Sequence, residues 1–353
     1  MPESALCELA RARGATCIEV GDFSVPAAFG DPVAEWRALC EDAALVDLAF
    51  RERVRVGGAD RVDFLQGMLS NDVRTLAPGR GCPALLLSDQ GKVVGDLVVV
   101  PLADAVLLDG MATAVAAVVA ALERYVVADD VEVAALGGAD HAIGLYGPQA
   151  AATLARLGPG APPGDPYGFA TLDLAGSAVL TQRVPVPAPG GFLCYVPAAA
   201  APAWWTRCLD AGVRPAGQRA FDVLRIEGGV PWHGRDVSAE TLALEAPLEH
   251  AISFTKGCYL GQEVVERVSA RGHVNRRLMG LEIAGETAPE AGDRLFAGAR
   301  EIGWVTSVAW SWRLSCTVAL GYVRREYWAP GTALEVGARA GRLPVTVRAL
   351  PFA

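Results

Sequence analysis

The hydrophobic and polar positions of this chain change period several times, which predicts a mixture of helices and strands. DPVAEWRALCEDAALVDL (31–48) begins with an N-cap aspartate and a first-turn proline, and its apolar residues follow at helical spacing. FRERVRVGG (50–58) alternates like a strand, and ADRVDFLQGMLSND (59–72) returns to the helical period. CPALLLSDQGKVVGDLVVVPL (82–102) predicts two strands joined by a turn around 89–91.

The order of the later elements predicts the fold class. Helical and strand patterns alternate irregularly up to about residue 270, which favours an α+β fold over a regular parallel winding. Short alternating strands with glycine turns then predict a small C-terminal β-barrel. We place the boundary near Arg271 to Arg276, so that two interleaved α+β domains occupy 1–271 and the barrel occupies 272–353.

Length and composition restrict the class of protein. A chain of 353 residues is long enough for two or three lobes and a ligand cleft. With 52% hydrophobic residues, 20% charged residues and a net charge of −9, a soluble protein is expected, with no direct nucleic-acid partner. The sequence shows neither a leader pattern nor a membrane-length apolar stretch, so we expect a cytoplasmic protein without membrane association.

The cysteines and histidines do not predict a metal site. Eight cysteines are scattered without a C-x-x-C pair, and none of the four histidines is spaced i, i+4 from another. We therefore expect no metal bound by the chain itself, and most of the cysteines to be small buried residues.

The stretch FTKGCYLGQE (254–263) concentrates reactive side chains between glycines. Cys258 precedes a short amphipathic helical pattern and follows Lys256 by two residues, and both features stabilise a thiolate. Cys258 would then be an accessible nucleophile or a transient contact for sulfur or metal. In the plainer alternative, Cys258 packs against Tyr259 while Lys256 and Glu263 are solvated. Spacing alone leaves both interpretations open.

Two further positions carry unusual charge. Asp96 lies inside a valine-rich strand, where aspartate is rare, and shares a face with Val94 and Val98. It either points to solvent or forms a partly buried carboxylate that can position a proton or stabilise a cation. Arg225 and Glu227 stand beside a double glycine and predict either a structural ion pair or a pair at the edge of a cleft.

Several motifs together resemble a known family. KGCYLGQE (256–263), FLQGMLSNDVRTL (64–76), GKVVGDLVV (91–99), VLRIEGGVPWHGRDV (223–237), EIGWVTSVAW (301–310) and VALGYV (318–323) are similar to successive landmarks of the YgfZ family of folate-binding proteins, which is related to the T-protein of the glycine cleavage system. The resemblance covers most of the chain. It implies a cloverleaf of three domains around a central folate cleft, with a β-barrel last. Tetrahydrofolate or a one-carbon derivative is the implied cofactor.

The resemblance also assigns roles to residues. Asp96 matches the catalytic aspartate of the T-protein, and Cys258 joins it as a catalytic candidate. The implied cofactor-binding residues are Asp96, Arg225, Glu227, Lys256, Tyr259, Gln262 and Glu263.

Three landmarks depart from the T-protein. VDLAF (46–50) lacks the histidine and methionine of the family's Asp-Val-Ser-His-Met run. The glutamate that reads the pterin falls at Leu193, and an arginine expected to face the acidic tail falls at Phe221, although Arg219 stands nearby. These departures predict weakened or reshaped folate binding.

The leading hypothesis is therefore an accessory protein that binds tetrahydrofolate and supports the assembly or repair of iron–sulfur proteins, with client proteins or assembly factors as partners. The first alternative is a tetrahydrofolate-dependent one-carbon transferase, for aminomethyl or methyl groups, in which Asp96 stabilises the charged adduct. The second is a scaffold that has kept the fold and lost folate.

Overall fold

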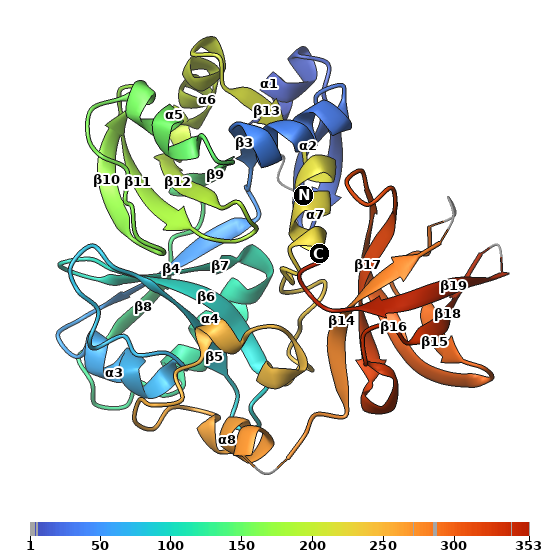
Figure 1. Cartoon of the computed structure of the whole chain (residues 1–353). Helices are drawn as coiled ribbons and strands as arrows, with labels where there is room; N and C mark the ends of the chain where they lie inside the picture. The colour runs from blue at the N-terminus through green and yellow to red at the C-terminus, as the bar shows by residue number, and fades with distance from the viewer. Residues whose placement is uncertain (1–3, 5, 271, 285–287, 340, 353) are drawn as a thin grey trace. The chain divides into compact units, whose positions relative to one another are not determined.

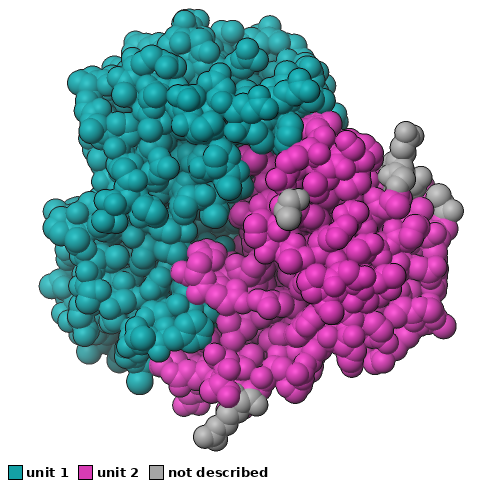
Figure 2. Space-filling model, viewed as in Figure 1, with its two compact units in different colours: residues 1–87, 94–221, 251–260 teal, residues 88–93, 222–250, 261–353 magenta. Residues whose placement is uncertain are grey.

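The computed structural model describes residues 4, 6–270, 272–284, 288–339 and 341–352 (Figure 1). Their contacts group them into two compact units, which Figure 2 colours separately. Unit 1 comprises 1–87, 94–221 and 251–260, and unit 2 comprises 88–93, 222–250 and 261–353. Arg271, where the predicted domain boundary begins, lies outside the described residues. The division into 1–271 and 272–353 stays a prediction.

Unit 1 contains two sheets and a separate hairpin. One sheet has the order β10(Phe169–Leu174)-β11(Ser177–Val184)-β12(Gly191–Pro197)-β9(Asp140–Tyr146)-β3(Ala44–Asp47)-β13(Arg214–Ala216). The other has the order β5(Cys82–Leu87)-β6(Val93–Pro101)-β7(Val106–Met111)-β4(Arg51–Gly57)-β8(Glu132–Ala135). The hairpin pairs β1(Thr16–Val20) with β2(Phe23–Ala28). β13 runs parallel to β3, while β3, β9, β10, β11 and β12 pair antiparallel.

The helices of the chain are short. They are α1(Cys7–Ala12), α2(Pro32–Glu41), α3(Arg61–Met68), α4(Ala112–Glu123), α5(Ala150–Leu157), α6(Ala201–Asp210), α7(Gln218–Glu227) and α8(Gln262–Ala270), with 3₁₀ turns η1(Ala198–Ala200), η2(Ala243–Glu245), η3(Glu249–Ala251) and η4(Arg325–Tyr327). Apolar residues of α5 and α6 share one core with β9, β11 and β12, and those of α3 and α4 share another with β4 to β7. No helix within the described ranges is long and apolar enough to span a membrane.

Unit 2 contains a closed six-stranded barrel, as the sequence predicted. Its order is β14(Arg276–Ile283)-β17(Cys316–Arg324)-β16(Arg300–Ser311)-β15(Arg294–Ala297)-β18(Ala333–Ala338)-β19(Gly341–Arg348), with every neighbour antiparallel. The residues inside the barrel are aliphatic, among them Leu281, Val305 and Val347. Closure leaves the sheet without a free edge. The predicted α+β fold with a C-terminal barrel is confirmed.

The helix predicted over 31–48 is correct only in its first half. Asp31 caps α2, because its Oδ1 accepts hydrogen bonds from the amides of Val33 at 2.9 Å and Ala34 at 3.3 Å. The second half is wrong, since Ala44–Asp47 forms β3. All four residues of this strand are buried, and a continuous apolar run of that length has no period to separate strand from helix.

The predicted turn between β5 and β6 is present and needs its glycine. Gly91 adopts φ +71°, and its amide donates to the carbonyl of Ser88 at 2.9 Å. A side chain at this position would also come within 2.7 Å of Val264 on α8. The turn therefore depends on a residue without a Cβ for both backbone and packing reasons.

Candidate functional site

Asp96 lies in the middle of β6 and is half-buried. It shares its face of the strand with Val94 and Val98, which are also half-buried, whereas Gly95 and Leu97 on the other face are buried. The alternation seen in the sequence predicted this placement. The strand therefore holds the carboxylate in a fixed position, partly shielded from water.

Tyr167 is the first neighbour of Asp96 that sequence reasoning missed. Burial, and then the nearby carboxylate of Asp96, raise the pKa of Tyr167 to about 12. Two backbone hydrogen bonds of 3.0 Å hold this residue. Its amide donates to the carbonyl of Arg183, and its carbonyl accepts from the amide of Gly81. Tyr167 has φ +59°, a conformation that non-glycine residues adopt at a cost. A tyrosine so held stays protonated at neutral pH and can donate a hydrogen bond.

Gln182 on β11 is the second residue that the sequence analysis missed. Its side chain is fully buried, yet neither its carboxamide oxygen nor its nitrogen has a hydrogen-bond partner among the described residues. A Cβ at Gly81 would lie 3.1 Å from Nε2 of Gln182 and 2.2 Å from the carbonyl of Val99, so only glycine fits there. A buried amide without partners is costly in the free protein, which makes it a candidate contact for a ligand.

The signal for Gln182 was present in its strand. SAVLTQRV places one uncharged polar amide in a run of apolar and β-branched residues, much as Asp96 interrupts β6. The strand pattern alone could not distinguish a solvent-facing glutamine from a buried one, because alternation does not reveal which face is covered.

Lys256 makes three backbone hydrogen bonds near the C-terminus of α3. Its Nζ donates to the carbonyls of Gln66 and Leu69 at 2.7 Å and of Asn71 at 2.9 Å. An ammonium group at this end of a helix satisfies carbonyls that lack partners within the helix. Burial lowers the pKa of Lys256 to about 8. The plainer alternative, in which Lys256 is solvated, is therefore wrong for this side chain, whose ammonium group ties residue 256 to the end of α3.

Cys258 is exposed, whereas Tyr259 beside it is buried. Of the eight cysteines, which all fall within the described ranges, Cys258 alone is exposed. Tyr259 is buried, with the Nζ of Lys256 5.4 Å from its ring centroid. The motif passes from unit 1 to unit 2 between Leu260 and Gly261. The thiol is therefore accessible, as the functional interpretation of the turn requires.

Gln262 and Glu263 form the first turn of α8. The Nε2 of Gln262 donates to Oε1 of Glu266 at 2.6 Å, a pair one helical turn apart. Glu263 is exposed. These two side chains stay proposed ligand contacts.

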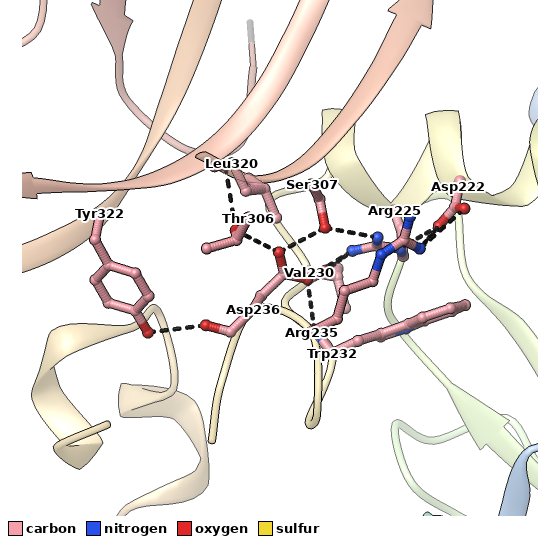
Figure 3. A network of polar contacts seen from close by, with 10 residues as sticks. All are labelled: Asp222, Arg225, Val230, Trp232, Arg235, Asp236, Thr306, Ser307, Leu320 and Tyr322. Atoms are coloured by element: carbon pink, nitrogen blue, oxygen red, sulfur yellow. Dashed lines mark hydrogen bonds and ion pairs between the residues drawn. The ribbon is translucent and has the colours of Figure 1, made fainter. Parts of the chain in front are cut away.

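Arg225 is fully buried within unit 2, where Figure 3 shows its partners. Its guanidinium donates to Asp222 at 2.6 Å, Asp236 at 2.9 Å and Ser307 at 2.9 Å, and it lies 4.4 Å from the ring centroid of Trp232. Although burial alone would raise it, the guanidiniums of Arg225 and Arg235 hold the pKa of Asp222 below its ordinary value. This geometry favours the structural alternative for Arg225.

The carboxylates of Asp236 and Glu227 also accept hydrogen bonds from neighbouring residues. Asp236 accepts from Thr306 and Ser307 at 2.6 Å and from the amide of Trp232 at 3.0 Å. Glu227 is buried as well, and it accepts from Ser311 at 2.5 Å with Arg313 at 3.6 Å. Arg225 and Glu227, predicted as either a structural ion pair or a pair at the edge of a cleft, are thus both buried in unit 2, and each has partners of its own.

Leu193 and Phe221, two of the positions that the resemblance marks as departures from the T-protein, are apolar and buried. Leu193 on β12 pairs across the sheet with Gln182 on one side and Gly144 on the other. The ring of Phe221 lies 4.8 Å from that of Tyr146, centroid to centroid. Arg219 is exposed on the first turn of α7. Gln182 is therefore the polar side chain directly opposite Leu193, the position to which the resemblance assigns the glutamate of the T-protein.

Comparison with known proteins gives a consistent answer along the chain. The GCVT N-terminal domain matches residues 6–256, and the glycine cleavage T-protein C-terminal barrel domain matches residues 276–353. An aminomethyltransferase of Saccharopolyspora erythraea is 32% identical, with 99% of this chain and 97% of the relative covered. One of Geobacillus kaustophilus is 31% identical, with 96% and 95% covered.

A solved structure agrees with this assignment. The glycine cleavage system aminomethyltransferase T of Bartonella henselae superposes with a TM-score of 0.89 at 26% identity, covering 100% of this chain and 98% of that one. The chain belongs to the aminomethyltransferase family of the glycine cleavage T-protein. That family uses tetrahydrofolate.

Proposed function

We propose that this protein binds tetrahydrofolate and transfers a one-carbon unit to or from it, with Asp96 as the carboxylate at the reacting centre. The observation that carries the proposal is the half-buried Asp96 beside a protonated Tyr167, in a chain similar to aminomethyltransferases over its whole length. This function was the first alternative of the sequence analysis, and the similarity supports it better than the accessory role.

The roles of the residues follow from their charges. Tetrahydrofolate, when bound, supplies the nitrogen atoms that carry the one-carbon unit. The carboxylate of Asp96 stabilises the positive charge that develops as such a unit moves between nitrogen atoms, and partial burial strengthens that interaction. Tyr167 keeps its proton, because its pKa is raised to about 12, and its hydroxyl donates a hydrogen bond to an acceptor on the ligand.

Gln182 is the residue that fits a folate ring. A pterin edge presents both N–H donors and a carbonyl acceptor, and a carboxamide offers one acceptor and one donor group. Its buried and unpartnered state means that a ligand would supply hydrogen bonds which the free protein lacks. We therefore propose that Gln182 takes part in ring recognition in place of the glutamate that is Leu193 here.

The test begins with calorimetric titration of the purified chain with tetrahydrofolate and 5-formyltetrahydrofolate. We expect saturable binding by the unmodified protein. Asp96→Asn should retain binding within about threefold but lower the rate of one-carbon transfer at least a hundredfold, because the carboxylate acts on charge in the transition state. Asp104→Asn is the matched control, since Asp104 is an exposed carboxylate of unit 1 paired with Arg55.

Two outcomes would overturn the proposal. An Asp96→Asn protein that transfers one-carbon units at the rate of the unmodified protein would remove Asp96 from the chemistry. Absence of any folate binding at millimolar ligand would instead leave a scaffold that has kept the fold and lost the cofactor.

A second function is favoured by the exposed Cys258. In this alternative the protein is a YgfZ-type accessory factor that binds folate and supports iron–sulfur proteins, and the KGCYLGQE turn contacts its clients or assembly factors. Leu193 and Phe221 also support it, because they stand where the resemblance expects the glutamate and the arginine that bind folate in a transferase.

Cells that lack the gene, complemented with variants, separate the two functions. If the accessory role is correct, Cys258→Ser should lower the activity of iron–sulfur enzymes while Asp96→Asn leaves it intact. The opposite pattern, in which Asp96→Asn lowers the activity of iron–sulfur enzymes and Cys258→Ser leaves it intact, supports the transferase.

A further inference from the structure

The barrel carries a pocket of about 720 Å³ whose described lining belongs entirely to unit 2. Its size is within the range of small-molecule sites. The residues that matter for its chemistry are Arg276, Arg294, Trp304, Tyr322, Arg324 and Arg325. The pocket is thus lined by arginines and aromatic rings in a chain whose net charge is −9.

Strand register brings these side chains onto one face. Tyr322 on β17 pairs with Trp304 on β16, and Trp304 pairs with Arg294 on β15. Two residues further along β17, Arg324 lies on the same face as Tyr322 and pairs with Arg276 on β14. Residues that point into the barrel core, such as Val323, lie on the opposite face. The row therefore lies on the outside of the barrel.

The aromatic part of this face is rigid. The rings of Trp304 and Tyr322 lie 5.0 Å apart, and the guanidinium of Arg276 lies 5.0 and 5.1 Å from their centroids. The hydroxyl of Tyr322 donates to the carbonyl of Asp236 at 2.9 Å, as Figure 3 shows. Trp304 stays half-buried, so part of its ring system faces the pocket.

The positive charges on this face are only partly matched. Arg276 pairs with Glu245 at 3.0 Å, and Arg294 pairs with Glu301 at 3.5 Å. Arg324 and Arg325 have no ion pair within the part of the chain that the structure describes. The described lining contains two acidic residues, Glu301, which pairs with Arg294, and Glu326.

Arg276 and Arg324 also stand directly opposite each other on neighbouring strands. Like charges in that position repel, and an anion between them relieves the repulsion. The excess of positive charge and the repelling pair both favour a negatively charged ligand.

We propose that this pocket binds a small anion of at least two negative charges that carries a planar ring, as a nucleotide does. The anionic groups pair with Arg324 and Arg325, which offer forked donors suited to phosphate or carboxylate. The planar ring stacks on the accessible part of Trp304. The residues that line this pocket are not among those proposed for one-carbon transfer, and the proposal does not depend on that function.

The first experiment titrates the full chain with ADP in the absence of metal, and follows heat and tryptophan fluorescence. We expect saturable binding that weakens as sodium chloride is raised, because the paired groups are charged. The double variant Arg324→Ala/Arg325→Ala should lower the affinity at least tenfold. Arg348→Ala is the matched control, since Arg348 lies on the same barrel, pairs with Glu282 and does not line the pocket.

Two further measurements test the ring contact. Trp304→Phe keeps an aromatic surface and should hold the affinity for ADP within about threefold while removing most of the fluorescence change. Inorganic pyrophosphate should bind more weakly than ADP by at least threefold.

Three results would overturn the proposal. Failure of both ADP and pyrophosphate to bind would exclude the anion site. Equal affinity in the arginine double variant would place binding elsewhere. Pyrophosphate binding as tight as ADP binding would show that the ring makes no contact.

Discussion

Two polar regions of the molecule differ in how completely their hydrogen bonds are satisfied. Around Arg225 in unit 2, each nitrogen of a fully buried guanidinium reaches a partner, and Asp236 accepts from Arg225 and from three further donors. In unit 1, the buried amide of Gln182 beside Gly81 has no partner among the described residues, and burial and the carboxylate of Asp96 raise the pKa of Tyr167. The first region serves the fold, and the second contains a buried amide whose hydrogen bonds are not made within the described residues.

Whether a buried polar group has hydrogen-bond partners distinguishes a role in stability from a role in binding better than membership of a sequence motif does. Arg225 and Gln182 are both fully buried polar side chains. A satisfied buried network loses stability when one member is removed, whereas an unsatisfied group loses mainly what it binds. The following changes test that distinction.

The largest effect is expected from Arg225→Met. Removing the guanidinium leaves Asp222 and Asp236 without their buried cation, which costs about 3–5 kcal/mol of the free energy of unfolding. Urea denaturation measures this loss. Arg235→Ala is the control, because Arg235 is a more exposed partner of the same Asp222 and should cost less than about 1 kcal/mol. Equal losses in both variants would contradict the structural role.

Lys256→Met should have the next largest effect. Three carbonyls near the end of α3 lose their donor, which costs about 2–3 kcal/mol. Lys92→Met is the matched control, since Lys92 forms a partly exposed pair with Glu240 and should cost less than about 1 kcal/mol. A Lys256→Met protein with unchanged stability and weakened folate binding would instead assign this lysine to the ligand.

Gln182→Leu should raise the free energy of unfolding, in contrast to the two preceding variants. Replacing a buried amide that has no partner stabilises the free protein by about 1 kcal/mol, while tetrahydrofolate affinity falls about tenfold. Gln66→Leu provides the contrast: the Oε1 of Gln66 accepts from the amides of Val73 and Arg74, so its loss costs about 1 kcal/mol. Destabilisation by Gln182→Leu would mean that the amide already has a partner in the free protein.

The smallest expected effect is a dependence of stability on acid pH. Because the folded pKa of Asp222 lies below its unfolded value of about 3.9, the folded state binds fewer protons in that range. The stabilisation is complete above about pH 4 and is lost as the pH falls through the folded pKa. Urea denaturation between about pH 5 and pH 2.5 should show a steeper loss for the unmodified protein than for Asp222→Asn. Identical slopes would remove Asp222 from the acid response.

The sequence predicted much of this fold because local patterns decide local structure. The cap at Asp31, the alternation in β4 and β6, and the glycine of the β5–β6 turn each act within a few residues. The same patterns failed at β3, where burial on both faces removes the alternation. The family motifs added the folate cofactor and pointed to Asp96.

Only the tertiary structure decided which polar side chains have partners. Lys256 bonds to a carbonyl 190 residues earlier in the chain, and Arg225 bonds to a serine 82 residues later. Gln182 is buried against Gly81, so that its amide is shielded from water but not bonded. The sequence by itself predicted most of the elements, because caps, turns and apolar faces are set within a few residues, and its motifs predicted the relation to the T-protein of the glycine cleavage system. The division between structural and ligand-binding polar groups depends on contacts that folding makes between distant residues, and no local pattern contains them.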